Sequence, residues 1–99
     1  MTKPTLVLLH GVGLDHTMWG PVADLLSDAF EVVTPDLPGH GSRPPAPAGT
    51  TLADLADGVA EEVRPGSHLV GFSLGALVAQ HLARYRPDLA ATLTSVSSV

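Results

Sequence analysis

The sequence predicts an α/β fold in which a parallel sheet of about four strands is covered by helices on both faces. Short apolar runs of strand length alternate along the chain with stretches whose apolar residues recur at helical spacing. This alternation is typical of a parallel α/β sheet. The chain has 99 residues, enough for one domain at most, so residues 1–99 are expected to form a single unit.

The first half of the chain contains two predicted strands and one predicted helix. Residues 5–9 form a mostly apolar run that ends at a His-Gly pair, which indicates a strand buried on both faces. Pro21 suits the first turn of a helix, and apolar residues on one face extend that helix to residues 28–29. Residues 30–34 predict the second strand. Five of the nine prolines lie within residues 35–47, so an irregular, exposed loop is expected there.

The second half contains four more predicted elements, which alternate between helix and strand: residues 51–64, 68–72, 74–86 and 89–99. Thr51 and Asp54 have the spacing of a capping box, which begins the first of these helices, and a Pro-Gly pair ends it. The second helix stops before Pro87. The tail is rich in Thr, Val and Ser and is expected to be the fourth strand.

Composition argues against several classes of function. The chain has 5 basic and 10 acidic residues, a formal net charge of −5, and its basic residues are scattered, so nucleic acid is not an expected partner. Without cysteine it can form neither a disulfide framework nor a thiolate metal site. The apolar run of residues 6–9 is too short for a membrane span or a signal segment. We therefore expect a cytoplasmic protein with no membrane partner.

The strongest motif is Gly71-Phe-Ser73-Leu-Gly75, which fits the pattern G-x-S-x-G and lies between a predicted strand and a predicted helix. Such a turn forces the serine into a strained backbone conformation, and the two glycines let strand and helix approach without Cβ clashes. Ser73 is thus the candidate nucleophile. The helix that begins at Leu74 directs the positive end of its dipole toward the Ser73 hydroxyl. The alternative is that Ser73 only caps that helix.

The second motif is His10-Gly11-Val12-Gly13 at the end of the first strand. A hydrolase with a nucleophile elbow needs a backbone donor from this loop, so the N–H groups of Val12 and Leu74 are the candidate oxyanion hole. Gly11 and Gly13 flank the first donor. A structural turn is the alternative. A dinucleotide fingerprint is less suitable because the third glycine is missing, and the sequence contains no P-loop.

Together these motifs resemble the first half of the α/β-hydrolase fold family. The resemblance rests on residues 6–13, Trp19, residues 36–41 and residues 71–75. It implies hydrolysis of a small acyl substrate, which is a carboxylic ester, lactone or thioester, through an acyl-enzyme on Ser73 and without a metal or organic cofactor. The stretch of residues 10–19 is more narrowly similar to 3-oxoadipate enol-lactonases and related small esterases. Family branches that act on epoxides or haloalkanes carry aspartate at the elbow, so the serine argues against both.

The resemblance also implies an acid and a histidine that follow the elbow helix and later strands. After Ser73 the only histidine is His81 and the only acidic residue is Asp88, and neither is at the position of the family's triad residues. A structural role is expected for His10, through a hydrogen bond to nearby backbone, and for His68 and His81, whereas His16 and His40 are expected to be solvated. Asp36 is expected to form a turn. The later strands and the cap of the family are also expected to be missing.

Two classes of function therefore stay open. The first is a serine hydrolase or an acyltransferase whose remaining strands and triad residues lie outside this sequence. The second is a catalytically silent truncated chain, or an interaction module that self-associates through its exposed sheet edges.

Overall fold

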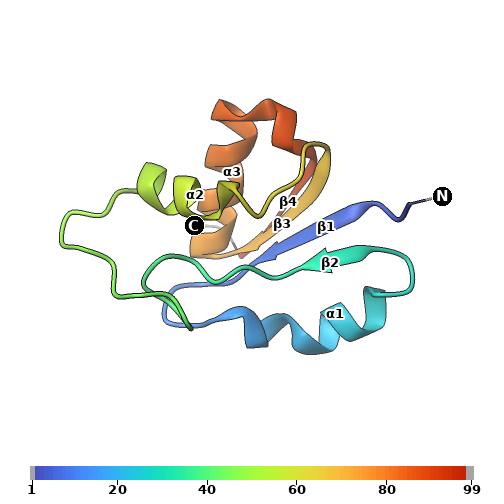
Figure 1. Ribbon diagram of the computed structural model, residues 1–99, viewed down its shortest axis with the longest axis horizontal. Coiled ribbons are helices and arrows are strands. Elements are labelled where there is room, and N and C mark those ends of the chain that lie inside the picture. The colour runs from blue at the N-terminus through green and yellow to red at the C-terminus, as the bar shows by residue number, and fades with distance from the viewer. Residues whose placement is uncertain (1, 98–99) are drawn as a thin grey trace.

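The computed structural model of the chain describes residues 2–97, and it has four strands, three α-helices and two short 3₁₀ helices in that range (Figure 1). In chain order they are β1 (Thr5–Leu9), η1 (His16–Trp19), α1 (Gly20–Leu26), β2 (Glu31–Val33), α2 (Leu52–Ala60), β3 (Ser67–Phe72), α3 (Leu74–Tyr85), η2 (Pro87–Leu89) and β4 (Ala90–Val96). All four predicted strands are present. The fourth ends at Val96, and residues 98–99 of its predicted range lie outside the described residues.

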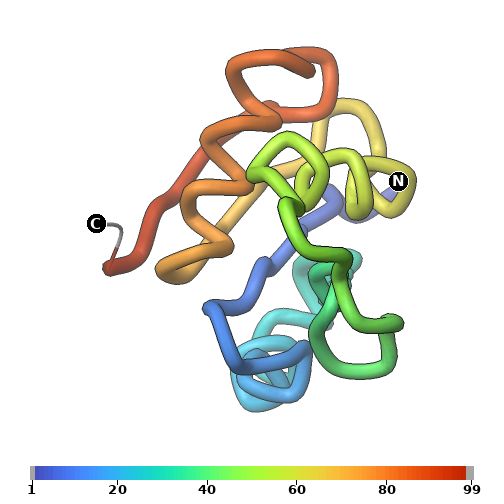
Figure 2. Tube along the Cα trace, turned by 90° about the vertical axis from the view of Figure 1, so that its left-hand side faces the viewer, coloured from blue at the N-terminus to red at the C-terminus, as the bar shows by residue number. Residues whose placement is uncertain are grey.

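The sheet is parallel and has the strand order β2-β1-β3-β4. Helix α1 covers one face, and helices α2 and α3 cover the other (Figures 1 and 2). This arrangement confirms the predicted fold class. The elbow strand β3 pairs directly with β1, with Leu9 opposite Gly71. The carboxyl ends of β1, β2 and β3 therefore meet at one edge of the sheet, which is where ligands bind in open α/β sheets.

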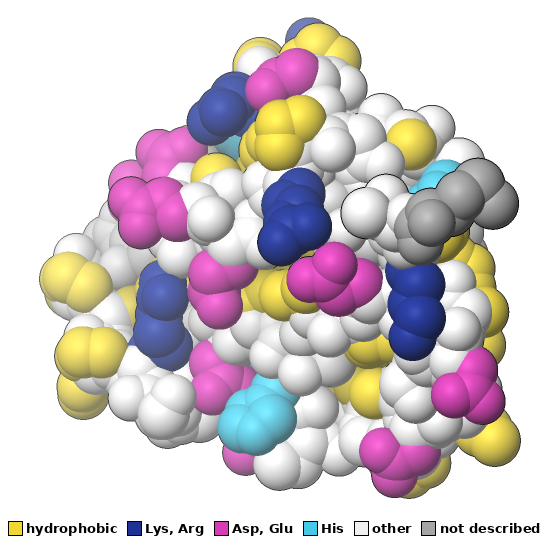
Figure 3. All heavy atoms as spheres, turned by 45° about the vertical axis from the view of Figure 1, so that its right-hand side comes forward, with side chains coloured by type: hydrophobic (Ala, Val, Ile, Leu, Met, Phe, Trp, Pro, Cys, Tyr) yellow, Lys and Arg dark blue, Asp and Glu magenta, His cyan; other side chains and the backbone are white. Residues whose placement is uncertain are grey.

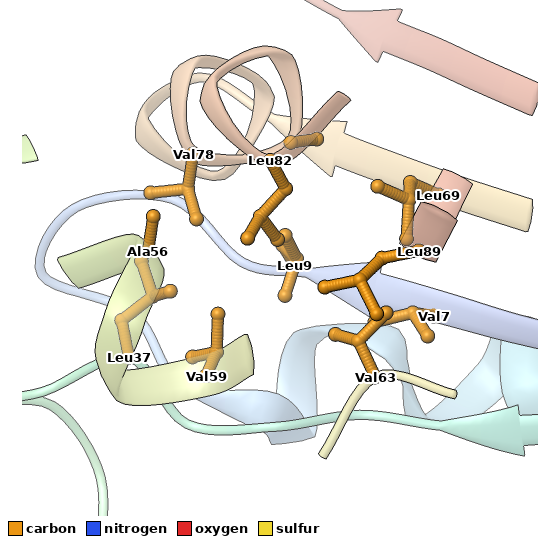
Figure 4. Close-up of a cluster of buried hydrophobic side chains, with 11 residues drawn as sticks. Val7, Leu9, Leu37, Ala56, Val59, Val63, Leu69, Val78, Leu82 and Leu89 are labelled. Atoms are coloured by element: carbon orange, nitrogen blue, oxygen red, sulfur yellow. The ribbon is translucent and has the colours of Figure 1, made fainter. Parts of the chain in front are cut away.

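Each face of the sheet has its own hydrophobic cluster. The cluster under α2 and α3 contains apolar side chains from both central strands, both helices and two loops (Figure 4). The cluster under α1 is smaller and is centred on Leu6, Leu8 and Trp19. All five residues of β1 are buried, because side chains on both of its faces are covered, as the apolar run predicts.

The segment between β2 and β3 agrees with some predictions and departs from others. The capping box is confirmed: Asp54 N–H donates to Thr51 Oγ1 at 3.1 Å, and Thr51 N–H donates to Asp54 Oδ2 at 2.9 Å. Helix α2 ends at Ala60, earlier than predicted, because the amides of Glu62 and Val63 make i→i−3 hydrogen bonds that tighten the chain into a turn. The proline-rich loop is irregular, as predicted, but it is not wholly exposed, since Leu37 is completely buried in the larger cluster.

The surface of the molecule carries mixed charge. On the face drawn in Figure 3, basic and acidic side chains are interspersed. None of the helices within residues 2–97 is long and apolar enough to cross a membrane.

Candidate active site

Ser73 occupies the sharp turn between β3 and α3. Its backbone has φ 54° and ψ −113°, a conformation that side-chain-bearing residues rarely adopt. The turn is held on both sides, because Ser73 N–H donates to Val96 O at 3.0 Å and the Ser73 carbonyl accepts from Ala76 N–H at 3.0 Å. A serine that caps a helix has an extended backbone and accepts a hydrogen bond from the first turn. Ser73 has neither property, so its geometry is that of an elbow and not of a cap.

The two glycines of the elbow stand where no side chain fits. A Cβ on Gly71 would overlap the carbonyl of Gly75, and a Cβ on Gly75 would overlap the carbonyl groups of Leu9 and His10. Helix α3 therefore begins in direct contact with the end of β1. The close contact brings the elbow and the loop after β1 together at the same edge of the sheet.

The loop that follows β1 forms a tight turn over residues 11–14. Leu14 N–H donates to Gly11 O at 3.2 Å, and Gly13 has φ 74°, which is unstrained only for glycine. A Cβ on Gly11 would lie 2.9 Å from the ring of Phe72, the residue before Ser73. Val12 is at the tip of this turn and is 67% exposed. Among the described residues, the N–H groups of Val12 and Leu74 donate none of the turn, loop or cap hydrogen bonds.

His10 is completely buried, and its ring lies between the loop that follows β1 and the loop that follows β2. Its Nδ1 lies 2.8 Å from Gly11 O, and its Nε2 accepts a hydrogen bond from Leu37 N–H at 3.0 Å. The predicted hydrogen bond to nearby backbone is thus present. The bond to Leu37, which lies 27 positions along the chain, could not be read from the sequence.

Asp36 links the same two loops by a second route. Its Oδ1 accepts from His16 N–H at 2.8 Å and pairs with His16 Nδ1 at 2.9 Å, while its Oδ2 accepts from Ser42 N–H and Oγ, both at 3.2 Å. Burial opposes ionisation, but these hydrogen bonds outweigh it and hold the pKa of Asp36 well below its usual value. The turn-forming role is confirmed by the Ser42 bonds. The bond to His16 was not foreseen, and it shows that His16 is paired.

The other three histidines and Asp88 also have partners, none of which is Ser73, and His40 Nδ1 lies 3.1 Å from Pro38 O. His68 Nδ1 lies 2.7 Å from Thr92 Oγ1, the ring of His81 packs on Tyr85 with centroids 4.6 Å apart, and Asp88 pairs with Arg86 at 3.7 Å. These contacts agree with structural roles for His68 and His81. Within residues 2–97, the Ser73 hydroxyl has no hydrogen-bond partner, and the chain forms no pocket. No three His, Asp or Glu side chains in the described part of the chain are grouped so that they could hold a metal ion.

The elbow, the glycine turn and the parallel sheet together match a known family. Residues 6–98 match the sequence profile of the Alpha/beta hydrolase family. The chain belongs to this family. The family resemblance and the fold class predicted from the sequence are therefore confirmed.

The relatives of this alpha/beta hydrolase include proteins named as esterases and one named as an acetyltransferase component. It is 43% identical over 91 residues to a pimeloyl-[acyl-carrier protein] methyl ester esterase of Methylococcus capsulatus, a match that covers 92% of the chain and 35% of the relative. It is 42% identical to the dihydrolipoyllysine-residue acetyltransferase component of the acetoin cleaving system of Cupriavidus necator, covering 96% of the chain and 26% of the relative.

Among solved structures, a thermophilic esterase from Thermogutta terrifontis superposes with a TM-score of 0.91 at 33% identity. That match covers 99% of the chain and 38% of the esterase. The chain thus spans between about a quarter and two fifths of the length of these three proteins. The narrower similarity to 3-oxoadipate enol-lactonases stays a prediction.

Proposed function

We propose that this chain carries the nucleophile and the oxyanion donors of a serine hydrolase that cleaves carboxylic esters through an acyl-enzyme on Ser73. The observation that carries the proposal is the elbow itself: a serine at φ 54°, between a strand and a helix, whose hydroxyl is not engaged as a helix cap. A protein retains such a strained turn where the strain serves a purpose, and a nucleophile held clear of the sheet edge is such a purpose. Esterases among the relatives support the same reaction class.

The chemistry would proceed in two steps. Ser73 Oγ bonds to the carbonyl carbon while its proton passes to a histidine base, and the N–H groups of Val12 and Leu74 stabilise the oxyanion. The C–O bond to the alcohol then breaks, and the alcohol leaves with that proton. Water attacks the acyl carbon in the second step, releases the acid and restores the Ser73 hydroxyl.

Residues 2–97 place no histidine base beside Ser73, because every histidine among them contacts another residue. We propose that the histidine and the acid belong to the portion of the relatives that this chain does not span. The substrate is a small ester, lactone or thioester. An acyltransferase would use the same serine and oxyanion donors, and a relative named as an acetyltransferase component keeps that variant open.

A fluorophosphonate probe tests the nucleophile directly, because it bonds covalently to an accessible serine hydroxyl held beside oxyanion donors; without the base in the same chain, we expect this reaction to be slow and to need a high probe concentration. We expect an adduct on Ser73, located by mass spectrometry, that is lost in Ser73→Ala and retained in the matched control Ser27→Ala, which removes an exposed serine at the end of α1. No adduct at any probe concentration, or an adduct that survives in Ser73→Ala, would contradict the proposal.

A second candidate is an interaction module that pairs through β4. This edge strand is exposed at six of its seven residues and contains no charged residue and no proline, the features that usually protect an edge from pairing. If β4 pairs with a second copy, the chain should sediment as a dimer, and Thr94→Lys should restore the monomer. A monomer at all concentrations would exclude this candidate.

A further inference from the structure

The peptide unit between Gly11 and Val12 is held by its carbonyl. Gly11 O accepts two hydrogen bonds, one from Leu14 N–H at 3.2 Å and one from His10 Nδ1 at 2.8 Å. In a planar trans peptide the N–H points opposite to the C=O, and the carbonyl of Gly11 belongs to the same unit as the N–H of Val12. Whatever fixes the direction of the Gly11 carbonyl therefore also fixes the direction of the Val12 N–H.

The partners of His10 define one tautomer of its ring. A carbonyl can only accept, so Nδ1 must carry the proton that reaches Gly11 O. A backbone N–H can only donate, so Nε2 must be unprotonated where it meets Leu37 N–H at 3.0 Å. The ring is neutral and is oriented at both ends, and it is completely buried.

Gly11, the first residue of this turn, is buried beside the Phe72 ring, but few side chains pack on the rest of the turn. Val12, Gly13 and Leu14 are exposed, so their side chains do not pack it into place. The Leu14 bond closes the turn but moves with it, whereas the His10 ring is fixed to a buried residue of a different segment. His10 is therefore a hydrogen-bonded connection between the turn and a buried residue of another segment.

We propose that His10 is a positioning residue, which aims the Val12 N–H by holding the Gly11 carbonyl and which must be the neutral Nδ1–H tautomer to do so. The catalytic meaning of this role rests on the proposed function, since Val12 matters only if it binds an oxyanion. The geometric claim stands independently of it. His10 itself touches no reacting atom.

Protonation of His10 would keep the Nδ1–H donor to Gly11 O but would place a second proton on Nε2, where it would face the Leu37 N–H and remove that hydrogen bond. Burial lowers the pKa of His10, the Gly11 carbonyl raises it, and the nearby His40, with ring centroids 5.0 Å apart, lowers it further. Asp36 and Asp15 are the other charged groups that act on the ring, and both raise its pKa. The lowered pKa keeps the positioning form populated at neutral pH.

Two substitutions at His10 separate positioning from packing. An asparagine amide nitrogen takes the place of Nδ1, so His10→Asn keeps the donor to Gly11 O and loses the acceptor for Leu37. A glutamine oxygen takes the place of Nε2, so His10→Gln keeps the acceptor and loses the donor. Both leave a buried polar side chain of similar size.

The direct readout is the direction of the Val12 N–H, measured as its residual dipolar coupling in the weakly aligned, ¹⁵N-labelled chain. We expect His10→Asn to keep the parental coupling and His10→Gln to change it, while couplings in β3 and α3 stay the same. A Val12 coupling that is unchanged in His10→Gln, or changed equally in both variants, would overturn the proposal. This readout needs no catalysis, so it decides the role of His10 even if the parent chain fails to react with fluorophosphonate.

If the parent chain does react, the labelling rate provides a second test. His10→Gln should lower the rate about 10²-fold, the loss typical of one oxyanion donor, while His10→Asn should stay close to the parent. Should either variant fail to fold, the ¹⁵N shifts of the imidazole in the unsubstituted chain decide instead. At pH 8 we expect a protonated Nδ1 and an unprotonated Nε2, and the opposite tautomer would overturn the proposal.

Discussion

Replacing Ser73 by glycine is expected to stabilise the chain while removing the proposed nucleophile. The backbone at this position has φ 54° and ψ −113°, and holding a residue with a Cβ in such a region costs on the order of 1–3 kcal/mol. Glycine avoids that cost but makes the unfolded chain more flexible, which takes back about 0.4–1 kcal/mol. Ser73→Gly should therefore exceed Ser73→Ala by about 1–2 kcal/mol in free energy of unfolding. Both variants lack the hydroxyl, so the comparison isolates the backbone.

The assay is urea unfolding of these two variants beside Ser27→Gly and Ser27→Ala. Ser27 has φ −64°, an ordinary helical value, so there glycine should be less stable than alanine by about 0.5–1 kcal/mol. The sign of the glycine-minus-alanine difference should thus reverse between the two sites. If glycine at position 73 is no more stable than alanine, the elbow is not strained and the main support for a nucleophile there is lost.

Three further changes probe the surroundings of the elbow. Gly75→Ala should destabilise the chain by about 1–3 kcal/mol, measured by thermal unfolding, because its Cβ would overlap carbonyl groups at the end of β1. Leu37→Ala should cost about 2–5 kcal/mol, since Leu37 is fully buried, whereas Leu25→Ala at an 82% exposed position should cost under about 0.5 kcal/mol; equal effects would refute the burial of the loop. Asp36→Asn should cost about 2 kcal/mol between pH 3.8 and 6.5. The pKa of Asp36 is lowered, so the stability that its carboxylate contributes is lost as pH falls below 3.8. The Asp36 hydrogen bond raises the pKa of His16, so the stability contributed by the charged pair is lost as pH rises above 6.5. A parent-to-variant difference that does not vary with pH would contradict this pairing.

Most of the fold could be predicted because local sequence patterns indicate its strands and helices. The buried run of β1 and the glycine-flanked turn at Ser73 are both short-range signals, and a parallel sheet follows once strands and helices alternate. The ends of elements were less predictable. Helix α2 stops at Ala60 and not at Arg64, because hydrogen bonds of the 3₁₀ type replace the last turn, and apolar spacing does not distinguish the two.

The candidate site was predictable in part for the same reason. Ser73 and the glycines around it lie within a few positions of one another, so their spacing alone indicates an elbow. The pairing of His16 with Asp36 joins residues 20 positions apart in two loops without regular structure. Parallel topology places the carboxyl ends of β1 and β2 at one edge, but it does not say which side chains meet there.

The burial of Leu37 and the role of His10 are two consequences of one requirement. A proline-rich loop has no ladder to pair its amides, so it is normally exposed, and that reasoning led to the wrong expectation for Leu37. Once an apolar side chain draws such a segment into the core, its N–H must find an acceptor, because a buried unpaired amide costs about 1–3 kcal/mol. The His10 ring supplies that acceptor at Nε2. Accepting there leaves the proton on Nδ1, and Nδ1 can then hold the carbonyl of the next residue. The packing of one leucine thus sets the tautomer that orients the turn beside Ser73.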